Sequence, residues 1–146
     1  MSSPDPHALV ESFAIPEERQ RAMAAMVPYP GGGARANRGL PLAPDRAEAL
    51  RRGLRHDNPA VRRCCLELLD NHPDPQATPL VALLLDDPVA RVRWHAVHAL
   101  LCDACSPGQS LLTPAARAAL ERVAREDPSE KVRSAAATGL AESTHA

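Results

Sequence analysis

The sequence predicts an all-α protein, a short solenoid of about three helix pairs that follows a helical N-terminal extension. The main observation is an internal repeat, in which a polar segment ends in Val-Arg and an Ala- and Leu-rich stretch follows. The repeat valines are Val61, Val92 and Val132. Aromatic residues make up only 2% of the 146 residues, so alanine and leucine must form the core. Such units cannot bury their apolar faces alone, which favours stacking.

The N-terminal part has helical character over residues 7–14 and 16–27. Pro16 suits the first turn of a helix because its missing N–H is not needed there. Apolar side chains such as Phe13 need cover, and terminal repeats are usually atypical. We therefore expect this part to cap the solenoid, with a tail that folds onto another molecule as the alternative.

Proline and glycine concentrate between residues 28 and 44, where no hydrophobic periodicity is present, and this composition predicts a linker. We place the domain boundary at its end. Residues 1–43 then form a cap or tail with the linker, and residues 44–146 form the repeat domain.

From Pro44 onward the helices are expected in pairs. The predicted first members span residues 45–55, 78–85 and 113–125, and the second members begin at Ala60, Ala90 and Glu130. At ~100° per residue, each second helix has one apolar stripe that can pack on its partner. The stripes are Val61, Cys65, Leu68, Leu69; Val92, Ala96, Ala99, Leu100; and Val132, Ala136, Gly139, Leu140.

The pattern Asp-Pro-x-x-x-Val-Arg, which begins at Asp87 and Asp127, resembles the HEAT repeat, especially the short units of phycobilin-lyase-type proteins. The resemblance covers about residues 44–143, and the first unit departs from it with Asp57 and Pro59. It implies a ladder of aspartate and arginine between neighbouring repeats, which fixes curvature and carries no chemistry. The implied members are Asp57, Asp87, Asp127, Arg62, Arg93 and Arg133.

Composition argues against several classes of partner. The net charge of -1 gives no excess of positive charge for a phosphate backbone, so we expect no nucleic acid. No apolar run is long enough to span a bilayer and no secretion signal is present, so we expect a cytoplasmic protein with no membrane partner. The cysteines should then be reduced thiols.

Histidine and cysteine gather near the end of the second predicted helix pair, at His95, His98, Cys102 and Cys105. These residue types are zinc and iron ligands, but a helix rises ~1.5 Å per residue, so one ion cannot bind all four. A real site needs a pair such as His98 and Cys102, or Cys102 and Cys105 where the helix frays, together with ligands from a neighbour such as Cys64 or His72. Such residues are common without metal, and we expect no metal and no cofactor.

The face of the second helices opposite the apolar stripes has the mixed character of a binding groove. Trp94 lies near its middle and has the composition of an interface hot spot, although it can equally cover a neighbouring helix. The predicted groove residues are Arg63, Glu67, Asn71, Arg91, Trp94, His98, Cys102, Thr138 and Glu142.

No arrangement of residues makes a positive case for catalysis, since no Gly-x-Ser-x-Gly motif or other nucleophile motif is present. The sequence therefore leads us to expect a monomeric, non-enzymatic module that binds a partner protein or peptide through the groove. The alternative is a small enzyme, a chromophore-handling protein or a metal-binding protein on the same scaffold, as the resemblance to bilin lyases implies.

Overall fold

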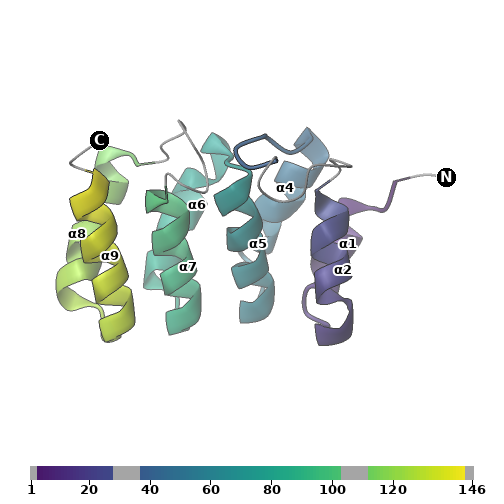
Figure 1. Ribbon diagram of the computed structural model, residues 1–146. Coiled ribbons are helices and arrows are strands. Elements are labelled where there is room, and N and C mark those ends of the chain that lie inside the picture. The colour runs from purple at the N-terminus through teal and green to yellow at the C-terminus, as the bar shows by residue number, and fades with distance from the viewer. Residues whose placement is uncertain (1–2, 28–36, 103–111, 144–146) are drawn as a thin grey trace.

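The structure is a computed structural model that describes residues 3–27, 37–102 and 112–143. Helical layers stand side by side in a single row, with the two ends of the chain at opposite ends of the row (Figure 1). The first layer holds α1 (Pro6–Ser12) and α2 (Pro16–Met26). The repeat layers are α4 (Pro44–Gly53) with α5 (Pro59–Asn71), α6 (Thr78–Leu83) with α7 (Ala90–Leu101), and α8 (Pro114–Glu126) with α9 (Glu130–Ser143). The predicted all-α solenoid is confirmed.

Local sequence explains where the helices begin. Proline occupies the first turn of α1, α2, α4, α5, α6 and α8, where its missing N–H costs no hydrogen bond. Asn58 caps α5 by accepting the Ala60 N–H, and Thr113 caps α8 by accepting the Ala116 N–H. The first helix of the second repeat, α6, is shorter than predicted and ends at Leu83. The 3₁₀ turn η1 (Pro75–Ala77) precedes it, and the 3₁₀ turn η2 (Leu84–Asp86) follows it.

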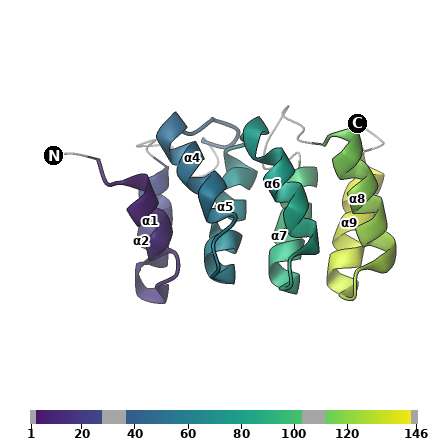
Figure 2. The same ribbon diagram turned by 180° about the vertical axis from the view of Figure 1, so that it is seen from behind.

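The repeat helices form two rows, α4, α6 and α8 on one side and α5, α7 and α9 on the other, as the two opposite views show (Figures 1 and 2). One continuous core of aliphatic side chains runs along the layers. The predicted stripes are buried, except that Gly139 and Leu140 are only partly covered. Gly139 allows a close approach of α9 to α7, because a Cβ there would lie 2.7 Å from Cδ1 of Leu101.

The N-terminal layer is part of the same core. Phe13 and Met26 are completely buried, and α1 packs against α4 and α5. The buried guanidinium of Arg46 donates to the carbonyl of Ala25 and to Oγ of Ser3, 2.8 Å away, which ties the extension to α4. A cap on the first repeat agrees with these contacts. The domain boundary at residue 43 stays a prediction, and most of the predicted linker, with Gly31 to Gly33, lies outside the described residues.

The ladder implied by the HEAT resemblance is confirmed at two steps. Arg62 donates from Nε and Nη2 to both carboxylate oxygens of Asp87, at 2.7 and 3.1 Å. Arg93 makes the same two bonds to Asp127, at 2.8 and 3.2 Å. The first unit differs, since Asp57 contributes only its backbone carbonyl to Arg62 among the contacts of the described residues. The ladder therefore joins each repeat to the next through a bidentate, nearly buried ion pair.

None of the helices in the described part of the chain is both long and apolar enough to cross a lipid bilayer.

Candidate metal centre and adjoining pocket

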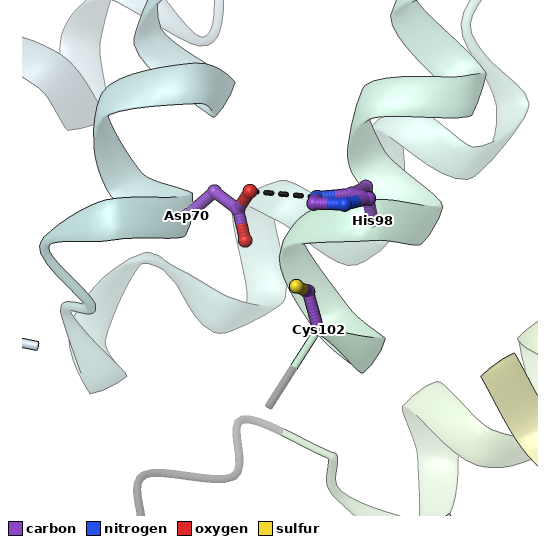
Figure 3. A group of neighbouring side chains, drawn as sticks. All are labelled: Asp70, His98 and Cys102. Atoms are coloured by element: carbon purple, nitrogen blue, oxygen red, sulfur yellow. Dashed lines mark hydrogen bonds and ion pairs between the residues drawn. The ribbon is translucent and has the colours of Figure 1, made fainter. Parts of the chain in front are cut away.

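Three potential metal ligands from two neighbouring repeats meet at the C-terminal ends of α5 and α7. Asp70 comes from the last turn of α5, while His98 and Cys102 come from the last turn and the C-cap of α7 (Figure 3). One ligand atom from each residue lies within 4.8 Å of the other two. His98 Nδ1 lies only 2.6 Å from Asp70 Oδ2. A carboxylate, an imidazole and a thiol thus face one small volume.

The repeat explains this convergence. Asp70 follows Val61 by nine residues, and Leu101 follows Val92 by the same number. Leu101 contacts the next repeat at Gly139, and Asp70 likewise points at the next repeat, where it meets His98. Residues four apart share one face of a helix, so Cys102 lies one turn beyond His98.

The surroundings of Asp70 and His98 favour a charged pair. Asp70 is only 8% exposed, and its hydrogen bond raises the pKa of His98 above the usual value, against the opposing effect of burial. The indole of Trp94 stacks on the imidazole of His98, with ring centroids 5.3 Å apart and an angle of 20° between the planes. Lys131 Nζ lies over the same indole ring, 5.8 Å from its centre. The imidazole is therefore held in position by a carboxylate and an aromatic ring.

A pocket of about 630 Å³ opens beside this cluster, between α7 and α9. His98 and Cys102 form part of its wall, so the cluster faces a cavity of the size that small organic molecules occupy. Its lining combines apolar and polar side chains: Trp94, Val97, His98, Leu101, Cys102, Glu130, Lys131, Ser134, Ala135, Thr138, Gly139 and Glu142.

A second pocket of about 560 Å³ lies on the other side of Trp94, which lines both pockets together with Lys131. Glu67 is held there by Arg63, 2.7 Å away, and lies 3.6 Å from Nε2 of His95. Burial lowers the pKa of His95, and the nearby Glu67 partly offsets this effect. His95 is therefore engaged with Glu67 in this second pocket.

The structure distributes the predicted groove residues over these features. Trp94, His98, Cys102, Thr138 and Glu142 line the larger pocket. Glu67 and Arg91 line the smaller one, where Arg63 and Asn71 hold Glu67 by an ion pair and by a hydrogen bond to its carbonyl. Their role in binding a partner stays a prediction.

The two additional ligands considered from the sequence lie elsewhere. Cys64 is completely buried in the core, and His72 is buried with its Nδ1 donating to the carbonyl of Leu40, 2.8 Å away. Cys105 lies outside the described residues. The ligand that the sequence analysis missed is Asp70. Its signal was an acidic residue at a repeat position that is apolar in the other two units, Leu101 and Ala141.

The donor set fits a transition metal better than a hard cation. Imidazole and thiolate are typical ligands of zinc and iron, and a carboxylate frequently completes such sites. A catalytic zinc site commonly has three protein ligands and one open position, whereas structural sites have four. Three donors beside a pocket match the first pattern.

Comparison with known proteins places the fold. A family model for HEAT repeats matches residues 47–141. The chain belongs to the HEAT-repeat family. No curated protein sequence gives a significant match.

This HEAT-repeat protein is also similar to a solved structure, human deoxyhypusine hydroxylase in complex with glycerol. The sequences are 25% identical and the TM-score is 0.63. The likeness covers 100% of this chain but only 46% of the hydroxylase chain. Likeness to an enzyme contradicts the expectation of a non-enzymatic interaction module, which was wrong because repeat architecture by itself carries no information on catalysis. The comparison supports the alternative of a small enzyme or a metal-binding protein.

Proposed function

We propose that this HEAT-repeat protein is a metal-dependent enzyme, or the metal-binding part of one. In this proposal Asp70, His98 and Cys102 bind a divalent transition metal ion and the adjoining pocket takes a small organic substrate. The observation that carries the proposal is the convergence of three different donor types within 4.8 Å of one another, two of which, His98 and Cys102, line a 630 Å³ pocket. The likeness to a hydroxylase supports an enzyme. Neither the substrate nor the reaction of that longer protein is transferred here.

The spacing of the donors agrees with a shared ion. Metal bonds of about 2.0 to 2.3 Å in a tetrahedral site place neighbouring ligand atoms roughly 3.5 Å apart. The upper limit of 4.8 Å in this cluster can reach that value with shifts of about 1 Å, which side-chain rotation provides. Cys102 follows the end of α7, and its extended backbone leaves its side chain outside the regular helix.

A bound ion of this kind polarises a substrate oxygen or lowers the pKa of a bound water. The protein supplies the orientation. The Trp94 ring fixes the plane of the His98 imidazole and offers an apolar surface to the substrate. Ser134 and Thr138 add hydroxyl groups along α9 that can hydrogen-bond to the substrate.

We also propose a cytoplasmic location. The cysteine thiols then stay reduced, so the Cys102 sulfur is available as a metal ligand.

Cobalt(II) is a suitable probe, because a cobalt-thiolate bond gives a near-ultraviolet absorption band that reports the thiol directly. We expect the purified full chain to bind one equivalent of cobalt, to show this band, and to lose part of the fluorescence of Trp94 stacked on His98. Zinc should then displace cobalt, following the usual order of affinities for nitrogen and sulfur ligands.

Two ligand variants and one matched control test the assignment. Cys102→Ser should abolish the thiolate band, and His98→Ala should weaken cobalt binding by at least about tenfold, since even loss of an outer-shell partner costs 10- to 100-fold. The control is His95→Gln, which removes an imidazole of the same helix that belongs to the second pocket. Binding that survives both ligand variants, or that His95→Gln weakens equally, would show that the metal site is wrongly assigned.

A further inference from the structure

The arginine ladder has a regular form in the inner repeats. Nη1 of Arg93 donates to the carbonyl of Asp87 in its own repeat, 2.8 Å away, and Nε and Nη2 grip the carboxylate of Asp127 in the next repeat. Arg62 does the same with the carbonyl of His56 and the carboxylate of Asp87. Each arginine therefore binds backbone carbonyl oxygen in its own repeat, two such groups in the case of Arg62, and one carboxylate in the following repeat.

At the N-terminal end of the ladder, a residue of the first repeat already has a partner in the N-terminal layer. His56 precedes the repeat valine Val61 by five residues. Asp87 and Asp127 hold the same position relative to the valines of their own repeats. Its Nδ1 accepts the Asn58 N–H at 3.0 Å, as those aspartates accept an N–H two residues on. Because Nδ1 is an acceptor, Nε2 carries the proton and donates to Glu11 of α1, 3.1 Å away. The N-terminal layer thus completes this step.

In the last repeat, only the bond from the arginine to the backbone carbonyl is present among the described residues. Nη1 of Arg133 donates to the carbonyl of Asp127 at 2.6 Å, as in the inner repeats. Within the described residues, its Nε and Nη2 bond to no carboxylate. The guanidinium of Arg133 therefore makes the same carbonyl contact as Arg93 but has no aspartate partner among the described residues.

An apolar position that is buried in α5 and α7 is exposed in α9. Leu66 and Val97, each five residues after its repeat valine, are 0% and 1% exposed. Ala137 holds this position in α9 and is exposed. In both views α8 and α9 form the last layer of the row (Figures 1 and 2). A cation and a small apolar surface are therefore presented together at the end of the solenoid.

We propose that this surface, defined by Arg133, Ala137 and Ala141, is a docking surface for a further HEAT-type helix pair that lies outside residues 1–146. Charge and geometry specify that occupant: an aspartate in the loop before its second helix must meet the fork of Arg133, as Asp127 meets Arg93. Alanine at both apolar positions lets a helix approach closely.

A second copy of this chain does not supply that aspartate in the same stacking. In that stacking its first layer, α1 and α2, would follow α9, and the loop before α2 holds Phe13, Ala14 and Ile15, none of which carries a carboxylate. The surface is independent of the proposed metal site, since it uses none of the residues that line the larger pocket.

The test extends the full chain with a second copy of residues 112–143, joined through a Gly/Ser linker. The tether holds the added pair at an effective concentration of about millimolar, so that weak docking is detected. The readout is native-state hydrogen exchange of the α9 amides in the original repeat. The matched control carries Asp127→Asn in the added copy only, which keeps the side-chain acceptor for Ser129 N–H but removes the charge that Arg133 needs.

We expect exchange in the original α9 to be about tenfold slower with the added pair than with its Asp127→Asn form. Replacing the original Arg133 with Gln should remove this difference, as a double-mutant cycle requires for a direct pair. Equal exchange with both added copies would overturn the proposal. Self-association of the unextended chain that Arg133→Gln abolishes would also overturn it, because the occupant would then be a second copy.

Discussion

The sharpest expectation concerns two arginines at equivalent positions of neighbouring repeats. Arg93→Ala and Arg133→Ala are the same chemical change, in the same turn of a second helix, with the same loss of helix-surface area. Arg93 grips the carboxylate of Asp127, whose side chain is only 3% exposed, whereas Arg133 meets a carbonyl alone among the described residues. The two variants should therefore differ strongly in stability.

The magnitudes follow from these contacts. Removing one partner of a buried ion pair costs about 3 to 5 kcal/mol, because the remaining charge stays buried. Asp127 keeps its bond from the Ser129 N–H, which favours the lower end of that range. Loss of a single hydrogen bond from Arg133 costs about 1 to 2 kcal/mol. The difference, roughly 2 kcal/mol, corresponds to about 4 to 8 °C in Tm for a chain of this size.

Urea unfolding of both variants, followed by circular dichroism, measures this difference directly. The slopes of the transitions must agree with wild type, so that the midpoints report stability. Equal losses for the two variants would refute the reasoning, because they would mean that the Arg93–Asp127 pair contributes no more than an exposed hydrogen bond. A larger loss for Arg133→Ala would mean that its fork is already bound in the isolated chain.

Three further outcomes are expected. Gly53→Ala should destabilise by about 1 to 3 kcal/mol despite the better helix propensity, because the new Cβ meets the Sγ of Cys65, and an unchanged urea midpoint would contradict this. Phe13→Ala should cost about 3 to 5 kcal/mol if the N-terminal layer belongs to the core, while a loss under about 1 kcal/mol would make it a loose tail. Burial lowers the pKa of His95, so its contribution to stability is present above the unfolded value near pH 6.5 and is lost as the pH falls through the folded value. In His95→Gln the free energy of unfolding should therefore fall less steeply than in wild type as the pH is lowered below 6.5. Equal slopes in the two proteins would show that Glu67 cancels the effect of burial.

Much of the fold could be predicted because repetition is a local property of the sequence. The repeat valines, the helix-starting prolines and the apolar stripes lie within single helices, and the 3.6-residue period converts them into faces without any knowledge of neighbours. The arginine ladder was anticipated only from the resemblance to the HEAT repeat, which implied the pairing of aspartate and arginine between neighbouring units. The exception was the first unit, where His56 replaces the aspartate and its partner Glu11 lies on a helix outside the repeat.

The metal cluster could be predicted only in part. His98 and Cys102 share one helix, so their spacing in the sequence brings them together. Asp70 comes from the preceding repeat, and helix spacing gives no information on which residues of adjacent layers are opposite each other. Cys64 and His72, the additional ligands considered from the sequence, lie close to Asp70 in the chain but are buried in other surroundings.

The sequence by itself determined the helices, their pairing and the face that each one buries, because these depend on the residue period and on local capping. Only the tertiary structure decided which groups of different repeats meet: Asp70 with His98, Glu11 with His56, and Arg133 with no carboxylate in the described chain. The physical reason is that the offset between stacked layers is set by packing of the whole interface, to which no single residue pattern corresponds.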